Sequence, residues 1–540
     1  MRLKCLQVTA LVVGAILIAV GIILLTVLPQ VIEKQIRAIN YLGTDGNGTL
    51  NAVTAKWRAP KYDMKMEIYV YNVKNWQNVT KGEKPDLEQL GPYTFTERQE
   101  KTMYEFNKNE SRIFYNNSHW AFFSQKLSCP TCFLNDTVVV PSIVYQKLVD
   151  YAKRGMMEKI AIETVLSFLS EPAFVKVKVG ELLYEGYEDA LLSKVCGTAI
   201  TKKICDALDI PSRIGLFYGQ NGTNDGTYEI NTGRYDSPLI GKVYSWNNKT
   251  VLPDTIWWSP EARKIEGLDG QLFPPSVQKG QLFHLFVAQI QRRISMEYKR
   301  EGEFWGVPSY QFGVPDSMND PTLPENKGFN NPDSPRFFTD TSVQPNGALP
   351  AGIMDLSAAL PGNPRIYVAQ PRFLHCPDAV RKAVIGIDAP NPAEDETLID
   401  IEPHTGVVIH ARRLSQLNLG VLNGGLKASG TMKDVIFPMI WLRETISFDR
   451  DTRDELLNKV VFITRSAFVG GIALVTIGVL LYAAFIAVAI AYRCQVSSNK
   501  VAPETDKEFL PQAGESPEDE NHLIVEEEPS DVESGSFAPI

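Results

Sequence analysis

The sequence predicts an α+β protein that is attached to a membrane near both ends. Two observations carry this prediction: an uncharged apolar run lies near each end of the chain, and strand patterns fill most of the interval between them. A third observation is one helical interval, residues 142–210, that interrupts the strands. A membrane-spanning helix needs about 20 apolar residues, whereas alternation of polar and apolar residues is typical of a half-buried strand. We therefore expect a β core with an inserted helical subdomain.

The two apolar runs are long enough to cross a bilayer. Residues 8–28 form 21 positions without a charge, and residues 466–492 form 27. A cleaved signal peptide is the alternative for the first run, but its apolar core exceeds the ~7–15 residues of such a peptide, and no small-residue cleavage site follows it. We expect two transmembrane helices that separate a short N-terminus (1–7), a central domain (29–465) and a tail (493–540).

Seven glycosylation acceptors predict that the central domain lies outside the cytosol. All seven Asn-x-Ser/Thr sequons lie between the two apolar runs, and the tail contains none. Basic residues flank both sides of the first run, so the positive-inside rule does not decide the orientation. We therefore expect a lumenal or extracellular central domain and two cytosolic termini. The expected glycan acceptors are Asn47, Asn78, Asn109, Asn116, Asn135, Asn221 and Asn248.

The seven cysteines divide in the same way. Cys5 and Cys494 flank the membrane on the cytosolic side, where palmitoylation and plain reduced thiols are the two alternatives. The other five face an oxidising compartment, and an odd number leaves at least one unpaired within the chain. The Cys-Pro-Thr-Cys motif at 129–132 has the spacing of a redox or zinc site, but no second such motif accompanies it. We expect short disulfides instead, between Cys129 and Cys132 and between Cys196 and Cys205.

The tail is acidic and carries a candidate sorting signal. Residues 495–540 contain 12 acidic and 2 basic residues, a balance of −10, while the whole chain has a net charge of −9. No basic groove for nucleic acid is indicated. The composition of the tail, rich in Pro, Ser and Glu, predicts disorder. Asp519, Leu523 and Ile524 have the spacing of an acidic dileucine signal, to which a sorting adaptor would bind.

Strand patterns and turn residues organise the central domain. Residues 221–226 are interpreted as a turn; they resemble the start of a calcium loop, but position 12 is Thr232 rather than Glu. Residues 314–364 are rich in Pro, Asn and Gly, which predicts an extended loop. Strands are expected at 65–71, 91–95, 227–230, 241–246, 365–368, 398–401, 406–412 and 435–442.

The helical interval contains the candidate ligand-binding residues. Apolar residues recur every four positions from Val144 to Ile160, which predicts a helix over 142–169, and a second helical patch covers 180–208. Basic residues near the polar side of the first helix would attract an anionic ligand, with a solvated face as the alternative. Methionines and aromatics would form an adaptable apolar mouth, with ordinary helix packing as the alternative. The candidates are Lys147, Lys153, Arg154, Lys159, Met156 and Phe168.

Several segments dispersed over nearly the whole chain match one known family. They lie at 91–95, 181–187, 215–218, 221–226, 267–275, 401–406 and 437–445. Their order and the two-helix frame resemble the class B scavenger receptor family. The turn at 221–226, the Trp257-Trp258 pair and the tail signal resemble its lysosomal integral membrane protein II branch.

This resemblance implies a fold, a function and a location. The implied fold is an antiparallel β-barrel-like core with an apical helical bundle, mapped to 142–210, and an internal tunnel that leads toward the membrane. The implied function is the binding and transfer of sterol, fatty acyl or phospholipid ligands at the lysosomal or late endosomal membrane, with the plasma membrane as a further location. The alternative is a structural or trafficking receptor that protects the lysosomal membrane or escorts a protein cargo.

Some features depart from that family or exclude other classes of protein. Residues 261–263 and 291–293 contain no cysteine where the family commonly has one, so the disulfide pattern must differ. Residues 142–210 contain no histidine, which argues against pH-dependent release of a cargo. No HExxH, GxSxG or P-loop motif is present, so we expect no enzyme, no cofactor and no metal site. Small residues that would pair the membrane helices or build a homo-oligomer are Ala483, Ala487 and Ala491.

Overall fold

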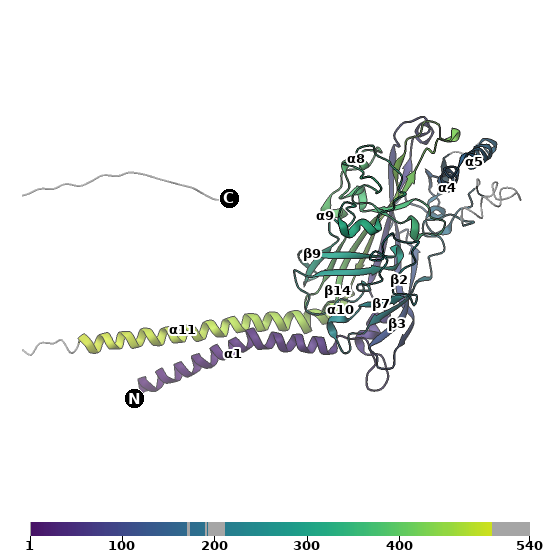
Figure 1. Cartoon of the computed structure of the whole chain (residues 1–540). Helices are drawn as coiled ribbons and strands as arrows, with labels where there is room; N and C mark the ends of the chain where they lie inside the picture. Colours follow the sequence, from purple (N-terminus) through teal and green to yellow (C-terminus); the bar gives the residue numbers. More distant parts are fainter. Residues whose placement is uncertain (1, 170–172, 190–191, 193–210, 499–540) are drawn as a thin grey trace, which may run out of the picture. The chain divides into compact units, whose positions relative to one another are not determined.

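The computed structural model describes residues 2–169, 173–189, 192 and 211–498 (Figure 1). The chain divides into two compact units, one of residues Met1–Leu17 and Thr476–Ile540 and the other of residues Ile18–Val475. The larger unit contains the folded domain, in which one large antiparallel sheet is combined with short helices. The predicted α+β class is therefore confirmed.

Two long helices contain the predicted membrane spans. They are α1 (Arg2–Ile39) and α11 (Phe462–Ser498), and both are long and apolar enough to cross a membrane. In the larger unit they touch at glycines, because a Cβ at Gly21 would lie 2.7 Å from Val475 Cγ2. Such close approach is what small residues permit between membrane helices. The predicted packing residues, by contrast, are exposed: Ala483, Ala487 and Ala491.

The sheet is nearly closed into a barrel, as expected. Its order is β7-β6-β3-β2-β1-β15-β14-β13-β10-β9-β8, and β12 pairs with β14 and β11. The edges meet through Leu268, which forms bridges with Lys242 beside β7 and with Leu285 in β8. The strands of this sheet are β1 (Asp63–Val73), β2 (Leu87–Phe106), β3 (Arg112–Phe123), β6 (Thr223–Asn231), β7 (Val243–Trp246), β8 (Leu282–Val287), β9 (Arg292–Phe304), β10 (Val307–Gly313), β11 (Met354–Asp355), β12 (Ile366–Ala369), β13 (Leu398–Ile401), β14 (Val408–Val421) and β15 (Val435–Ser447).

The helical interval differs from its prediction. The expected helix over 142–169 is two helices, α4 (Ile143–Ala152) and α5 (Met156–Leu169), with a break that includes Gly155. Glycine weakens a helix, and the two parts have different surroundings, since α4 is mostly buried while α5 begins with exposed methionines. The patch expected at 180–208 begins with a π-helical turn, Glu181–Glu185, and residues 193–208 lie outside the described part of the chain.

Other elements complete the fold. A two-stranded sheet of β4 (Thr137–Pro141) and β5 (Phe174–Lys178) flanks the α4–α5 pair, and neither strand was predicted. Residues 314–364 form mainly loops, as expected, with two short 3₁₀ turns and β11. The short helices are α2 (Ala52–Arg58), α3 (Trp76–Val79), α8 (Asp378–Arg381), α9 (Pro392–Asp395) and α10 (Arg450–Leu456).

The turn predicted at 221–226 is wrong in part, because β6 begins at Thr223. The first residues of this strand pair with β3, where Thr223 is the partner of His119 and Asn224 the partner of Ser118. This pairing overrides the turn preference of the Asn-Asp-Gly sequence. Gly226 remains necessary, because its φ is +91° and a Cβ there would meet Asn247 Oδ1 at 2.6 Å.

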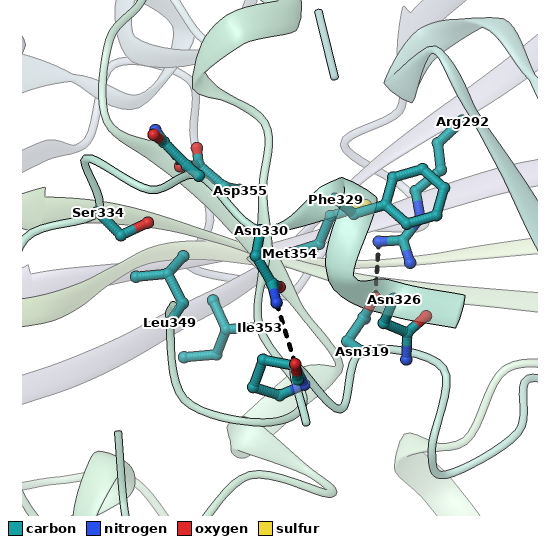
Figure 2. Close-up of a pocket in the computed structure, with 12 residues that line it drawn as sticks. Arg292, Asn319, Asn326, Phe329, Asn330, Ser334, Leu349, Ile353, Met354 and Asp355 are labelled. Carbon is teal, nitrogen blue, oxygen red and sulfur yellow. Dashed lines mark hydrogen bonds between the residues drawn. The ribbon is translucent and has the colours of Figure 1, made fainter. Parts of the chain in front are cut away.

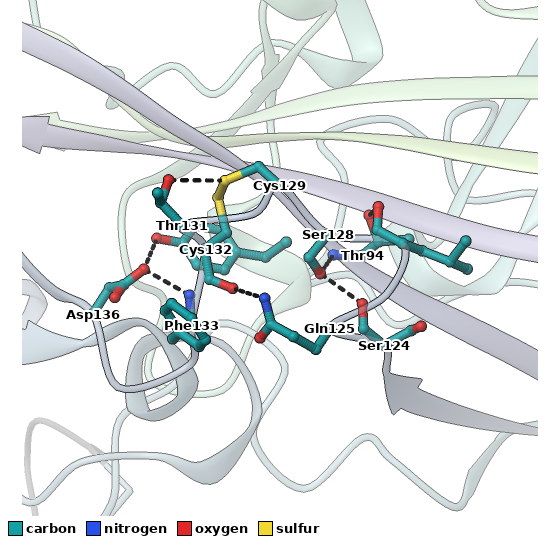
Figure 3. The surroundings of a disulfide bond; sticks show 11 residues. Thr94, Ser124, Gln125, Ser128, Cys129, Thr131, Cys132, Phe133 and Asp136 are labelled. Carbon is teal, nitrogen blue, oxygen red and sulfur yellow. Dashed lines mark hydrogen bonds between the residues drawn. A yellow bond between two sulfur atoms is a disulfide. The ribbon is translucent and has the colours of Figure 1, made fainter.

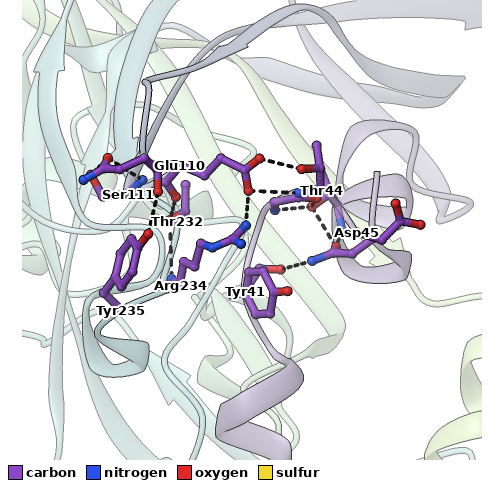
Figure 4. Close-up of polar contacts among 12 residues, drawn as sticks. Tyr41, Thr44, Asp45, Glu110, Ser111, Thr232, Arg234 and Tyr235 are labelled. Carbon is purple, nitrogen blue, oxygen red and sulfur yellow. Dashed lines mark hydrogen bonds and ion pairs between the residues drawn. The ribbon is translucent and has the colours of Figure 1, made fainter. Parts of the chain in front are cut away.

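The segment after α1 is tied to the sheet by polar contacts (Figure 4). The amide of Leu42 donates to the carbonyl of Thr232 at 2.8 Å, and the hydroxyl of Thr44 donates to Glu110 Oε1 at 2.5 Å. Glu110 also forms an ion pair with Arg234. Burial opposes these contacts, but the hydrogen bonds from Thr44 and the charge of Arg234 lower the pKa of Glu110, so the clamp is held by an ionised carboxylate.

Candidate functional site

The register of the central strands identifies the interior face of the barrel. Glu444 of β15 is the direct partner of Arg413 in β14 and of Met66 in β1, so the three side chains share one face. Ala411, which precedes Arg413 by two residues, lies in one buried cluster with Phe312 of β10. This face therefore points into the barrel.

Arg413 indicates that the barrel is hollow at this level. It forms an ion pair with Glu444, and Met66 on the same face is 6% exposed. Nevertheless, 46% of the side-chain surface of Arg413 is accessible. An inward-pointing side chain keeps that much accessible surface only where a space adjoins it. The guanidinium is therefore available to a molecule inside the barrel.

Two carboxyl groups accompany this guanidinium. Burial, and then the charge of Glu444, raise the pKa of Glu97 in β2 to about 9. Glu444 itself is 14% exposed and pairs with Arg413. A neutral Glu97 beside an ionised Glu444–Arg413 pair leaves little net charge, while hydrogen-bonding groups remain in the interior. We call Glu97, Arg413 and Glu444 the interior triad.

Aromatic side chains adjoin the interior triad. The Phe95 ring lies 5.5 Å from Phe123 and 5.0 Å from Tyr184, and Tyr184 lies 5.4 Å from Phe217. Tyr184 connects the two groups, because burial and the charges of Glu97 and Glu444 raise its pKa. An apolar aromatic wall beside a charged group matches the two parts of an amphipathic molecule.

A second polar group lies on the same strands, with Lys101 in β2 at its centre. Lys101 is 2% exposed, and its ammonium lies 5.2 Å from the centre of the Trp57 ring. Burial lowers its pKa to about 8, against the charges of Asp269 and Asp225. Tyr115 donates a hydrogen bond of 3.0 Å to Asp269, so the carboxylates in this group are partnered. The interior thus holds titratable groups at two levels.

The candidate ligand-binding residues of the helical interval have different surroundings. Lys147 in α4 is buried, and its amine donates to the carbonyl of Gly362. Lys153 and Arg154 are exposed between α4 and α5, and Lys159 in α5 is half-buried. Met156 is 74% exposed. Phe168 belongs to α5, but its side chain lies outside the described part.

Cys129 and Cys132 form a disulfide in the structure (Figure 3). It closes a short loop after β3, where the amide of Cys129 donates to the carbonyl of Pro92 at 3.0 Å. Cys376 is a free thiol whose pKa is raised by burial. Cys494 is free and exposed. Cys5 lies in α1 without a described side chain, and Cys196, Cys205, Asp519, Leu523 and Ile524 lie outside the described residues.

All seven sequon asparagines are accessible on the folded domain. Asn78 and Asn116 are half-buried, and the remaining five are exposed: Asn47, Asn109, Asn135, Asn221 and Asn248. Their positions are therefore compatible with the expected glycans.

A small polar pocket lies beside Arg292 (Figure 2). Its volume is about 20 Å³, which suits a single water and excludes a lipid. Arg292 donates to Asn319 Oδ1 at 2.9 Å and lies 3.8 Å from the centre of the Phe329 ring. This buried arginine fastens the 314–364 loop to β9.

The interior triad was missed by the sequence analysis. The strands predicted at 406–412 and 435–442 stop short of Arg413 and Glu444, so neither residue was placed in a strand. No local alternation marks them, because each stands beside a second charged residue, Arg412 or Arg443. Their pairing depends on the register between β14 and β15.

A family model matches most of the chain. The "CD36 family" model covers residues 12–489.

Curated relatives match over similar lengths. "Lysosome membrane protein 2" of Mus musculus is 28% identical over 447 residues, covering 82% of this chain and 85% of the relative. The human protein of that name has the same identity and coverage. "Scavenger receptor class B member 1" of Sus scrofa is 25% identical over 473 residues, covering 87% and 86%. These names denote membrane proteins and receptors rather than enzymes.

Proposed function

Because this chain belongs to the CD36 family, we propose that it binds lipids inside its barrel and transfers them to or from the membrane that holds α1 and α11. Sterol, fatty acyl or phospholipid molecules would place apolar parts against the aromatic wall and polar parts at the interior triad. The observation that carries the proposal is the accessible Arg413 side chain on an otherwise buried face.

The chemistry of the interior supports an amphipathic ligand. Burial of apolar ligand surface contributes roughly 25 cal/mol per Å², and the rings of Phe95, Phe123, Tyr184 and Phe217 offer such surface. Arg413 would donate hydrogen bonds to a carboxylate, phosphate or hydroxyl oxygen. Glu97, kept protonated by burial, would donate a further hydrogen bond without adding a charge that repels an anionic head group.

The α4–α5 pair is proposed as the place where ligands arrive. Exposed cations there, Lys153 and Arg154, would attract anionic lipid or lipoprotein surfaces, and the exposed Met156 would accept apolar groups of varied shape. Lys147 would act only indirectly, because its amine is already bound to a carbonyl.

A plug inside the barrel tests the proposal. Ala121 of β3 is the partner of Glu97, while its neighbour Phe122 points outward and is 55% exposed. The Ala121→Trp protein should lose most of its copurifying lipid, because the indole fills the space beside Glu97. Phe122→Trp is the matched control and should keep its lipid. Mass spectrometry of the full-length proteins measures this, and equal lipid content in the two variants would contradict the proposal.

Escort of a protein cargo is a second candidate function. It is favoured by exposed apolar side chains on α5, where Met156, Met157 and Ile160 are 74%, 75% and 52% exposed. Replacing Met157 by Glu should then abolish capture of a stable partner protein while leaving the lipid content unchanged. Loss of lipid without loss of a partner would instead support the lipid route.

We also propose residence in the lysosomal or late endosomal membrane, with cytosolic termini. The relatives named "Lysosome membrane protein 2" and the spacing of Asp519, Leu523 and Ile524 support this location. Replacing Leu523 and Ile524 by Ala should move the protein to the plasma membrane, because a sorting adaptor could no longer bind the tail. Continued lysosomal residence of this variant in cells would overturn the role of the signal.

A further inference from the structure

An open polar groove lies on the outer face of the sheet, across the same central strands that form the interior triad. Its volume is about 670 Å³, and β1, β14 and β15 supply most of its wall. The register of β1, β15 and β14 places the groove residues in rows across the sheet. Thr445 is the partner of both Lys65 and Arg412, and in the next row Glu67 is the partner of Arg443. Three cationic side chains therefore lie on one patch of the surface.

The cations of this groove are only partly balanced by carboxylates, since Arg372, which also lines it, pairs with Asp395 at 2.5 Å and lies 3.9 Å from Glu394. The guanidinium of Arg443 lies 3.7 Å from Glu67, whereas Lys65 and Arg412 form no ion pair with any described carboxylate. Arg412 and Arg443 also repel each other. The pKa of Arg412 is lowered by burial and then by the charge of Arg443. Like charges held together with too few counterions are typical of a site that receives an anion.

The hydrogen bonds of the two arginines are incomplete as well. Arg412 uses Nη2 to donate to the carbonyls of Ala393 at 2.8 Å and Glu396 at 3.2 Å, which fix the orientation of its guanidinium. The Nε–H groups of both Arg412 and Arg443 are buried without an acceptor among the described residues. Buried donors without an acceptor are costly, so an acceptor supplied by a ligand is favoured.

An aromatic pair borders the cationic patch. Tyr69 and Trp441, one row further along β1 and β15, stack with ring centres 3.9 Å apart and an interplanar angle of 4°. The Trp441 ring is buried and lies under Arg372, so only the half-buried Tyr69 ring offers an aromatic surface to the groove, where it suits a sugar or polyol. The volume of the groove also exceeds what one inorganic anion would fill.

We propose that this groove binds a phosphate or sulfate monoester of a sugar or polyol. The tetrahedral oxyanion would lie between Lys65, Arg412 and Arg443, with guanidinium forks donating to two of its oxygens. The hydroxyl-bearing body would lie against Tyr69, whose ring is only half-buried. A carboxylate would fit less well, because it offers two oxygens to cations that approach from three strands. The site is on the opposite face from the proposed lipid space and does not depend on it.

The chain offers matched variants for the test. Arg412 and Arg413 are consecutive, but only Arg412 lines the groove. Saturation-transfer NMR on the full-length protein in uncharged nanodiscs would use glucose 6-phosphate and galactose 6-sulfate as probes and glucose as the neutral control. We expect at least one ester to bind about tenfold more tightly than glucose, because charge-assisted hydrogen bonds are about twice as strong as neutral ones.

The double variant R412Q/R443Q should weaken ester binding at least about tenfold, whereas Arg413→Gln should leave it unchanged. The single variant K65Q breaks no ion pair and should weaken ester binding a few-fold. It tests the site independently in case the double variant does not fold. If phosphatidylinositol 4-phosphate in the nanodisc competes with the soluble ester, the natural ligand is a lipid head group. If it does not compete, the natural ligand is a soluble ester. Either result supports the site. The proposal is overturned if neither ester binds, or if binding survives in both R412Q/R443Q and K65Q.

Discussion

Arginines lie on both the inner and the outer face of β14 and β15, but their pairing with carboxylates differs between the two faces. On the inner face, Arg413 is paired with Glu444 and joined by a second, protonated carboxyl group, Glu97. On the outer face, Arg412 lacks an ion pair with the described carboxylates and its neighbour Arg443 has one at 3.7 Å. The inner arginine is balanced by a carboxylate although its side chain is 46% accessible, whereas the outer arginines are less accessible and less well balanced. The comparison teaches that a single residue step on a strand separates the proposed site for amphipathic molecules from the proposed site for anions.

The largest expected effect contrasts the two arginines directly. Arg413→Ala leaves Glu444 without its cation beside Glu97, and should lower the free energy of unfolding by about 2 kcal/mol, less than for a fully buried pair because Arg413 is partly exposed. Arg412→Ala should cost about 1 kcal/mol, the value of its hydrogen bonds to carbonyls. Denaturant unfolding of the two variants measures the difference. Equal costs would remove the distinction between the faces.

A smaller effect depends on pH and concerns the inner face alone. The folded-state pKa of Glu97 is raised from 4.5 to about 9, so the proton it holds contributes stability that is complete below about pH 4.5 and is lost as the pH rises toward 9. Glu97→Gln should therefore raise the stability at pH 8 relative to that at pH 5, by about 1 kcal/mol in total, because the solvent-accessible space beside Arg413 reduces the cost of an ionised Glu97. Thermal unfolding at the two pH values tests this. The outer variant Glu67→Gln is the control, and a similar pH dependence in both would contradict the assignment.

The smallest effect sharpens the account of the outer face. Glu67→Gln removes the only carboxylate paired with Arg443 among the described residues, and this half-buried pair, 3.7 Å apart, contributes about 0.5 kcal/mol. Stability should hardly change, but the affinity of the groove for glucose 6-phosphate should rise about two- to threefold as Arg443 becomes free. A titration by NMR measures the affinity. A fall in affinity would show that Glu67 contacts the ligand instead of competing with it.

Much of the fold could be predicted because its signals are local. Membrane helices appear as continuous uncharged runs, and β-branched alternation marks β1, β13 and the first part of β15. The hairpins of β8, β9 and β10 were missed. In β9, charged residues such as Arg300, Glu301 and Glu303 interrupt the apolar alternation, because much of the strand stays accessible to solvent.

The candidate sites were harder to predict because they arise from register. Glu97, Arg413 and Glu444 are far apart in the sequence and meet only when β1 lies between β2 and β15. The predicted ligand residues, by contrast, were close in sequence and came from one helical pattern. Even there Lys147 is buried and Lys153 is exposed in the structure, and a four-residue period in the sequence does not predict this difference.

The pairing of β1 with β15 has a consequence for the order in which the chain is made. Asp63, shortly after the first membrane helix, is the partner of Ser447, just before the second. Because β1 is central, the early strands β1, β2 and β3 can form a partial sheet during synthesis, but one edge of β1 stays open until almost the whole domain has been translated. Such a non-local contact is slow to form, and an open strand edge is prone to association with other chains. Completion of the barrel should therefore nearly coincide with synthesis of α11, and this interval is the period in which the nascent chain most needs a chaperone.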